Sequence, residues 1–233
     1  LIPGLGIVGV GRTSKEATIA SDLAECTLDV ISQAESFGKF KSISEKEIFK
    51  MEYWSLEQAK LKNLKRKYFS GNVVLISGGC GDIGLSTAKS FYDEGAEVIL
   101  LEKEQHHINN TPSNIKKFAK IIKCDVANSK SLNKAIIEVV KIYGGIDILV
   151  CNAGAPWQGE MASISKDVMQ KSLDLNLLSH HHISQHAVKI FLKQKTGGLL
   201  LYNISKQSIN PGKNFGPYGI AKAATLFMMR QYT

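Results

Sequence analysis

Alternation between short apolar segments and helical segments is the feature that most limits how this chain can fold. After about residue 70, strands are expected at Val73–Ile76, Val98–Leu101, Lys120–Cys124, Ile146–Val150 and Gly198–Ile204. Helices are expected between and after them, at Leu85–Glu94, Ser129–Tyr143 and Ser165–Lys193 and from Pro217 onward. The first of these strands is apolar throughout, as strands buried on both faces are. The pattern predicts an α/β fold with a doubly wound parallel sheet.

The first 70 residues are predicted to be mainly helical and to form a separate part of the chain. Thr13-Ser-Lys-Glu16 has the pattern of a capping box and begins a helix that Gly38 would end. Ser44-Glu-Lys-Glu47 begins a second helix, which is expected to continue into the basic stretch before Ser70. Ile2 to Val10 is glycine-rich and apolar, which is consistent with a short strand and turns.

This arrangement predicts two domains, residues 1–70 and residues 71–233. Two helices and one short strand make a small core for an independent domain. We therefore expect the first part to be the end of a larger domain whose beginning precedes Leu1. The chain is also expected to stop before the last strands of its sheet, which would leave an unpaired strand edge.

The net charge of +8 comes from 29 basic and 21 acidic residues, which raises the question of nucleic-acid binding. The densest basic cluster comprises Lys60, Lys62, Lys65, Arg66 and Lys67. It lacks interleaved aromatic residues and any nucleic-acid motif, so a solvated helix end and linker explain it better. No apolar run reaches membrane-spanning length. We expect neither a nucleic-acid partner nor a membrane partner.

Cysteine spacing and the first residues bear on the cellular compartment. Cys26, Cys80, Cys124 and Cys151 show no Cys-x-x-Cys spacing. Reduced thiols in a cytosolic protein are the simplest interpretation. The chain opens Leu1-Ile-Pro-Gly4 without the basic start of a signal peptide. A cytoplasmic location is therefore expected.

A glycine-rich turn, Ser77-Gly-Gly-Cys-Gly-Asp-Ile-Gly84, lies between the first expected strand of the sheet and the following helix. A dinucleotide-binding turn requires this context. Glycines let the backbone approach a pyrophosphate, and the helix N-terminus supplies amide donors. A plain tight turn is the alternative. The predicted cofactor-binding residues here are Ser77, Gly78, Gly79, Asp82, Ile83 and Gly84, as in a Rossmann domain.

Polar or small residues follow the next three expected strands. Glu102 could accept hydrogen bonds from the ribose hydroxyls of NAD and would repel the extra phosphate of NADP, although Lys103 beside it weakens that argument. Asp125-Val126 could contact the adenine, and Asn152-Ala153-Gly154 would let the backbone pass close to a cofactor. The alternative for Glu102 is an exposed acid at a strand end, and the alternative for the other two segments is ordinary loop chemistry. Their place at successive strand ends favours a binding crevice, and NAD is the expected cofactor.

A tyrosine and a lysine in the last expected helix form a candidate catalytic pair. They occur as Tyr218-Gly-Ile-Ala-Lys222, so both side chains lie on one helix face about one turn apart. An ammonium beside a phenol stabilises the phenolate, which lets such a tyrosine accept or donate a proton. Ser205, thirteen residues before the tyrosine, could hold a substrate oxygen. We predict Ser205, Tyr218 and Lys222 as catalytic residues.

Asn176 is a further candidate, because it lies inside the long expected helix in Asp174-Leu-Asn-Leu. An amide in mid-helix is usually at the surface or bonds locally. The functional alternative is a kink or a water site in a proton relay to Lys222.

Four nearby histidines, His180, His181, His182 and His186, raise the possibility of a metal site. The last two of these share a helix face. No carboxylate or cysteine completes a ligand set at a recognisable spacing, so no metal site is predicted.

Taken together, these residues make the stretch from about Asn72 to Arg230 resemble the short-chain dehydrogenase/reductase family. The resemblance implies that Tyr218 is the acid/base and that Lys222 assists it and binds the nicotinamide ribose. It also implies that Ser205 positions the substrate oxygen, with Ser208 as the alternative serine, and that Asn176 holds the relay water. Family members often form dimers or tetramers through the two long helices, so a homo-oligomer is possible.

Two positions depart from the family pattern. Asp82 replaces the usual second glycine of the turn, where its side chain could clash with or repel a pyrophosphate, although Gly81 beside it could compensate. Ser77 replaces the usual leading threonine, which is a mild change.

Residues 1–70 also resemble a known type of domain, the end of a class II aldolase-like domain. The resemblance rests on Pro3-Gly-Leu-Gly6, Glu52-Tyr-Trp-Ser-Leu-Glu57 and the basic linker. With Ser205 to Gly216, these segments look like bacterial bifunctional rhamnulose-1-phosphate aldolase/short-chain dehydrogenases. That resemblance implies rhamnose metabolism, with a small substrate such as lactaldehyde for the dehydrogenase part. Zinc-binding histidines of an aldolase would lie upstream of this chain.

Three functions are therefore open. The first is an NAD-dependent oxidoreductase that transfers a hydride between nicotinamide and a small hydroxy or aldehyde substrate. The second is an aldehyde-lyase as the main activity of a longer parent protein. The third is a non-catalytic nucleotide-binding domain, which Asp82 would favour and the complete Ser-Tyr-Lys set argues against.

Overall fold

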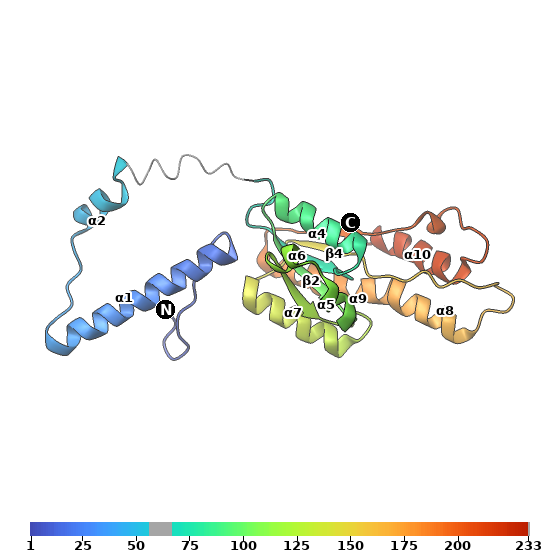
Figure 1. Cartoon of the computed structure of the whole chain (residues 1–233), viewed down its shortest axis with the longest axis horizontal. Coiled ribbons are helices and arrows are strands. Elements are labelled where there is room, and N and C mark those ends of the chain that lie inside the picture. The colour runs from blue at the N-terminus through green and yellow to red at the C-terminus, as the bar shows by residue number, and fades with distance from the viewer. Residues whose placement is uncertain (56–66, 233) are drawn as a thin grey trace. The chain divides into compact units, whose positions relative to one another are not determined.

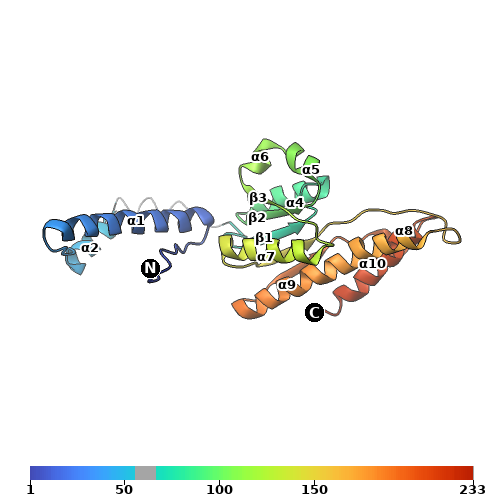
Figure 2. The ribbon, with the colours of Figure 1, turned by 90° about the horizontal axis from the view of Figure 1, so that it is seen from below.

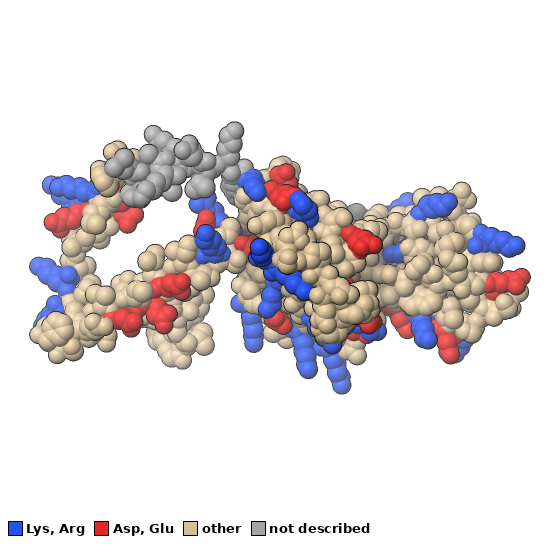
Figure 3. All heavy atoms as spheres, viewed as in Figure 1, with Lys and Arg blue, Asp and Glu red and all other residues tan. Residues whose placement is uncertain are grey.

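The structure is a computed structural model that describes residues 1–55 and 67–232. It divides into two compact units, Leu1–Ser70 and Gly71–Thr233. The predicted basic cluster falls almost wholly outside the described residues, as does the expected continuation of the second helix toward it. On the face shown in Figure 3, acidic side chains lie among the basic ones over both units. Among the described residues, no helix combines the length and apolar character needed to span a bilayer.

The first unit contains α1 (Ser14–Phe37) and α2 (Glu45–Glu52), drawn in blue in Figure 1. Ser44 caps α2 with a complete capping box, as predicted. At α1 only half of the predicted box forms: the Thr13 hydroxyl accepts from the Glu16 amide at 3.1 Å, but the Glu16 carboxylate accepts from the Arg12 amide instead. The predicted strand near the start is also wrong, because a turn closed by the single Ile2–Gly6 bridge takes its place.

The second unit contains a parallel sheet of five strands among its described residues. The strands are β1 (Val73–Ser77), β2 (Glu97–Glu102), β3 (Ala119–Lys123), β4 (Ile148–Cys151) and β5 (Leu199–Tyr202). Their order across the sheet is β3-β2-β1-β4-β5, and each neighbouring pair is parallel. The predicted doubly wound Rossmann fold is confirmed.

Helices cover both faces of this sheet, as Figure 2 shows. On one side lie α4 (Asp82–Asp93), α5 (Gln105–Asn110) and α6 (Ser113–Lys116). On the other side lie α7 (Ser129–Tyr143) and α9 (Ser179–Gln194). The two short helices α5 and α6 between β2 and β3 were not predicted.

The core forms because alternate side chains of each strand point to opposite faces. One set of alternating residues, including Leu75, Ile99 and Leu149, is fully buried against the apolar sides of α7 and α9. The intervening residues, including Val74 and Leu100, are equally buried on the other face. This two-sided burial explains why Val73 to Ile76 of β1 are all apolar.

The last helices carry the catalytic candidates Asn176, Tyr218 and Lys222. A long helical segment contains α8 (Lys166–Leu173), the π-helix η1 (Asp174–Leu178) and α9. The helix α10 (Gly216–Met229) packs against α8 and η1. The long helix predicted from the sequence therefore exists, with a π-helical turn around Asn176.

Candidate active site

A cleft of about 860 Å³ opens at the carboxyl ends of the strands. Because β1 lies between β2 and β4, the strand order reverses at this point, and ligands of doubly wound sheets bind there. Predicted site residues that line the cleft are Gly78, Asp82, Ile83, Glu102, Asp125, Val126, Asn152, Ala153, Gly154, Tyr218 and Lys222. The others, Ser77, Gly79, Gly84, Asn176 and Ser205, lie outside its lining.

The glycine turn between β1 and α4 is shaped by close backbone packing. Gly78 has a φ of 60°, which side-chain-bearing residues rarely adopt. A Cβ at Gly84 would lie 2.6 Å from the Gly78 carbonyl oxygen, so only glycine lets α4 begin this close to the turn. The first amides of α4 have no partner within the helix, which makes its N-terminus suitable for an anion. Asp82 lies exposed in that first turn.

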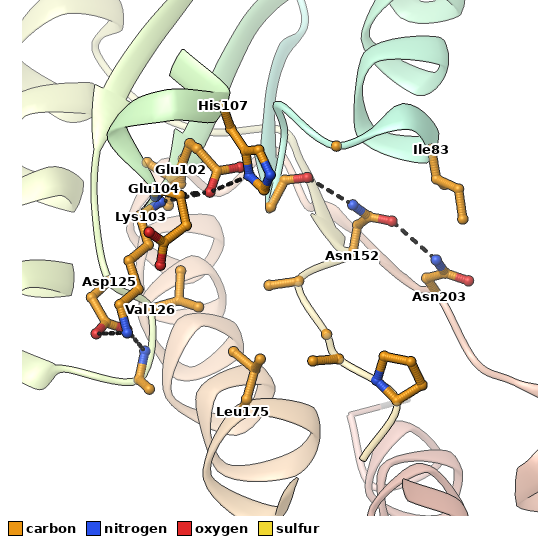
Figure 4. A pocket seen from close by; sticks show the side chains of 18 of the residues that line it. Ile83, Glu102, Lys103, Glu104, His107, Asp125, Val126, Asn152, Leu175 and Asn203 are labelled. Carbon is orange, nitrogen blue, oxygen red and sulfur yellow. Dashed lines mark hydrogen bonds and ion pairs between the residues drawn. The ribbon is translucent and has the colours of Figure 1, made fainter. Parts of the chain in front are cut away.

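One end of the cleft, here called the carboxylate end, consists of Glu102, Lys103, Glu104, His107 and Asp125 (Figure 4). The Glu102 carboxylate is 92% buried and accepts from the amides of Lys103 and Glu104 at 2.9 and 3.1 Å. His107 Nδ1 lies 3.5 Å from the same carboxylate oxygen. Lys103 Nζ is 3.1 Å from Asp125 Oδ2. The Glu102 and Asp125 carboxylates therefore each have a partner, and Lys103 is directed to Asp125 rather than to Glu102.

The other end, here called the lysine end, is built around the segment after β4. Its residues are Asn152, Asn203, Tyr218 and Lys222. Figure 4 shows Asn152 between the glycine turn and Asn203. The Asn152 side-chain amide donates to the Gly78 carbonyl at 3.0 Å, and its oxygen accepts from Asn203 at 3.0 Å. The lysine end is thus joined to the glycine turn by hydrogen bonds.

Ser77 and Asn176 hold this segment from outside the cleft. The buried Ser77 hydroxyl accepts from the amides of Asn152 and Ala153 at 3.0 and 3.1 Å. The Asn176 side chain is fully buried, accepts from the Ala155 amide at 3.2 Å and donates to the Ala155 carbonyl at 3.0 Å. The Asn176 carbonyl accepts from the Thr225 hydroxyl at 2.6 Å. Both residues shape the segment that faces the cleft.

The Tyr218 and Lys222 side chains come from one face of α10, as their spacing predicted. Lys222 Nζ lies 5.9 Å from the centre of the Tyr218 ring and donates to the Asn203 carbonyl at 2.8 Å. Lys222 is 2% exposed, and this burial lowers its pKa to about 8. Burial favours the neutral amine, so this cation is held in the site at an energetic cost.

Ser205 lies beyond β5, where its hydroxyl caps a short 3-10 helix, η2 (Lys206–Ser208), by accepting from the Gln207 amide at 3.3 Å. The alternative serine, Ser208, donates to the Ser205 carbonyl at 2.6 Å. Both serines therefore bond within the turn itself. The catalytic role predicted for Ser205 stays a prediction.

Several residues of the cleft are not predicted by the sequence patterns. Asn203 follows β5 as Asn152 follows β4, so its position at a strand end could have identified it. His107 lies in the unpredicted helix α5, and Trp157 lies in a long loop. No spacing pattern marks either of them.

Comparison with known proteins decides the family. The sequence model of the short chain dehydrogenase family matches residues 72–233. The chain belongs to this family. The second domain of class II aldolases matches residues 1–61. The chain is also 31% identical, over 99% of its length, to an uncharacterized oxidoreductase of Bacillus subtilis named YuxG.

Other relatives agree with this family membership. Human dehydrogenase/reductase SDR family member 4 is 25% identical over 74% of the chain. The chain spans 34% of YuxG and 63% of the human protein. A solved structure of NAD⁺-bound xylitol dehydrogenase matches 71% of the chain and 65% of its own, with a TM-score of 0.68 and 24% identity. This last similarity concerns the fold.

Proposed function

We propose that this chain forms the dehydrogenase part of an NAD-dependent oxidoreductase acting on a small hydroxy or aldehyde substrate. The observation that carries the proposal is the placement of Tyr218 and Lys222 at one end of a cleft whose other end presents Glu102. Bound nicotinamide would supply the hydride chemistry. The chain's own residues would hold the cofactor and move the proton.

The residues around the glycine turn fit a dinucleotide. A Cβ at Gly78 would lie 2.9 Å from Ala153 Cα, and one at Gly84 would lie 2.6 Å from the Gly78 carbonyl oxygen, so glycine at both positions allows the close backbone packing of a dinucleotide-binding turn. The buried Glu102 carboxylate offers a hydrogen-bond acceptor to ribose hydroxyls and would repel a 2′-phosphate. This second property is the argument for NAD rather than NADP.

Proton transfer is assigned to Tyr218, whose hydroxyl would exchange a proton with the substrate oxygen. Lys222 would stabilise the phenolate electrostatically and donate to the nicotinamide ribose. Asn203 holds Lys222 in place through its carbonyl oxygen at 2.8 Å. Ser205 would orient the substrate oxygen, and Asn176 would hold a relay water, as the family resemblance implies.

Titration of the chain with NADH and with NADPH, followed by nicotinamide fluorescence, tests the cofactor part of the proposal. Saturable binding with a preference for NADH is expected. Absence of binding by either nucleotide would contradict the proposed function. Equal binding of both would contradict the role given to Glu102.

A second function is favoured by the match of residues 1–61 to the aldolase second domain. We propose that a longer parent protein is a bacterial-type bifunctional enzyme that also cleaves rhamnulose 1-phosphate, with lactaldehyde passing to the dehydrogenase part. A cytoplasmic location and a homo-oligomer belong to this proposal. The full-length protein is expected to cleave that sugar phosphate and to lose this activity when a chelator removes its metal. Cleavage unaffected by a chelator would contradict a class II mechanism.

A further inference from the structure

His180 is an unusual residue to find in the interior of the second unit. It lies in the first turn of α9, and its side chain is fully buried. Its Nε2 atom is 2.7 Å from the carbonyl oxygen of Ala153, in the segment that lines the lysine end. A carbonyl oxygen only accepts hydrogen bonds, so Nε2 carries the proton and donates.

The surroundings of the ring favour its neutral form. Burial and the nearby Lys222 ammonium lower the pKa of His180 to about 4. Cys151 of β4 and Tyr202 of β5 also face this region; burial raises the pKa of Cys151 to about 12 and also raises that of Tyr202, so both are neutral. Lys222 is therefore the charged neighbour that opposes protonation of the ring.

The second ring nitrogen indicates that His180 is more than a filler of space. Nδ1 is buried and has no hydrogen-bond partner among the described residues. Leaving a buried polar atom unpaired destabilises a folded protein by about 1–3 kcal/mol. An apolar residue would fill the same volume without that cost. What His180 offers in return is its one bond, the donation to Ala153.

The donation from His180 fixes Ala153, which is also held by Ser77 and packs against the glycine turn. The Ala153 amide is held by the Ser77 hydroxyl at 3.1 Å, and His180 holds the carbonyl of the same residue. Ala153 also packs so closely on the glycine turn that a Cβ at Gly78 would lie 2.9 Å from its Cα. A shift of Ala153 would therefore disturb the turn and the Asn152–Gly154 wall together.

We propose that His180 is a positioning residue, which fixes the Ala153 carbonyl and so holds residues 152–155 in the geometry that receives the nicotinamide half of the cofactor. The assignment of a cofactor rests on the proposed function above. The proposal that His180 holds residues 152–155 does not depend on a cofactor.

The other histidines of α9 differ from His180 in their surroundings. His181 Nδ1 lies 2.9 Å from the Tyr232 hydroxyl, and His182 and His186 are only partly buried. Among the described residues, no group of three or more metal-ligating side chains gathers. His182 is therefore a suitable control, because it lies on the same helix and takes no part in the network at the lysine end.

Hydrogen exchange of the cofactor-free full chain tests the positioning role directly. His180→Leu removes the donor at similar volume, whereas His180→Gln keeps an N–H group that can reach the same carbonyl. The leucine variant is expected to speed amide exchange of residues 152–155 about tenfold while strand β2 stays protected. The glutamine variant should restore most of the protection, and His182→Leu should leave it unchanged.

Uniformly faster exchange across the whole sheet in His180→Leu, without rescue by glutamine, would overturn the proposal in favour of a general structural role. Should the leucine variant fail to fold, nitrogen NMR of the wild-type ring decides the matter. A neutral ring protonated at Nε2 and slow to exchange supports the proposal, and a proton on Nδ1 overturns it.

NADH titration of the same variants then connects the segment to the cofactor. His180→Leu is expected to weaken NADH binding about tenfold, the loss that one hydrogen bond commonly causes. His180→Gln should recover most of that loss. Unchanged affinity in His180→Leu alongside faster exchange would overturn the link to the cofactor. Failure of the wild-type chain to bind would contradict the proposed function, while the exchange result would still decide whether His180 holds the segment.

Discussion

The two ends of the cleft are built in different ways. At the carboxylate end, most residues are neighbours in sequence, directly after β2, and several are exposed. Lys103, for example, has a side chain that is 61% exposed. At the lysine end, Asn152, Asn203 and Lys222 come from three separate elements, and Lys222 is buried. The carboxylate end is a local feature that can be changed one side chain at a time, whereas the lysine end is a connected network.

The largest effect is expected from Tyr218→Phe at the lysine end. Removal of the hydroxyl takes away the proposed proton donor, so turnover should fall by about 10²–10⁴-fold. NADH binding should stay within about twofold, because the ring remains. Steady-state rates with a small aldehyde and NADH, together with fluorescence titration, measure both. Tyr68→Phe, at an 84% exposed position, is the control. Unchanged turnover would remove Tyr218 from the mechanism.

The next effect concerns the burial of Lys222, whose pKa is lowered from 10.5 to about 8. Between these pH values the unfolded chain holds a proton that the folded chain has lost, so raising the pH favours folding. Wild type should therefore gain stability relative to Lys222→Met, by up to about 3 kcal/mol between pH 8 and 10.5. Denaturant unfolding at several pH values measures this difference. A difference independent of pH would show that the lysine is not held in a desolvated site.

At the carboxylate end, Glu102→Ala should lower the preference for NADH over NADPH. Loss of the carboxylate removes a partner for the ribose and a source of repulsion for a 2′-phosphate, so the NADH to NADPH affinity ratio should fall about tenfold. Parallel titrations with both nucleotides measure the ratio. Glu94→Ala, at the C-terminal end of α4 and outside the cleft lining, is the control. An unaltered ratio would exclude Glu102 from cofactor recognition.

The smallest effect is expected from Lys103→Ala, which breaks the 3.1 Å ion pair with Asp125. Because both side chains are partly exposed, the free energy of unfolding should fall by less than about 1 kcal/mol. Thermal or denaturant unfolding at low and high salt measures it. A loss of several kcal/mol would mean that the carboxylate end is also a cooperative network, and the contrast between the two ends would disappear.

Much of the cleft was predictable from local sequence. The alternation of strands and helices indicates the glycine turn and the polar residues at strand ends. The helix period places Tyr218 and Lys222 on one face. The same periods do not reveal the short helix α5, which brings His107 to Glu102. They also indicate an amide in mid-helix without saying that Asn176 would be fully buried and bonded to Ala155.

In the first unit, local signals predict where the helices begin but not whether they are buried. Thr13 and Ser44 begin their helices as predicted, because caps depend on residues a few positions apart. Yet no residue of α1 or α2 is buried, and Leu23 is 63% exposed. An apolar stripe predicts a helix face that can be buried, but it does not say what covers it.

The parallel sheet, the place of the cleft at the carboxyl ends of its strands and eleven of the residues that line it could be predicted from the sequence alone. These depend on short-range periodicity and on topology rules for strands joined by helices. Three-dimensional packing was needed to show that one of four histidines is buried against Ala153 and that the Asn203 carbonyl accepts from Lys222. Those contacts join residues far apart in the chain, and burial, rather than residue type, sets the chemistry of each group.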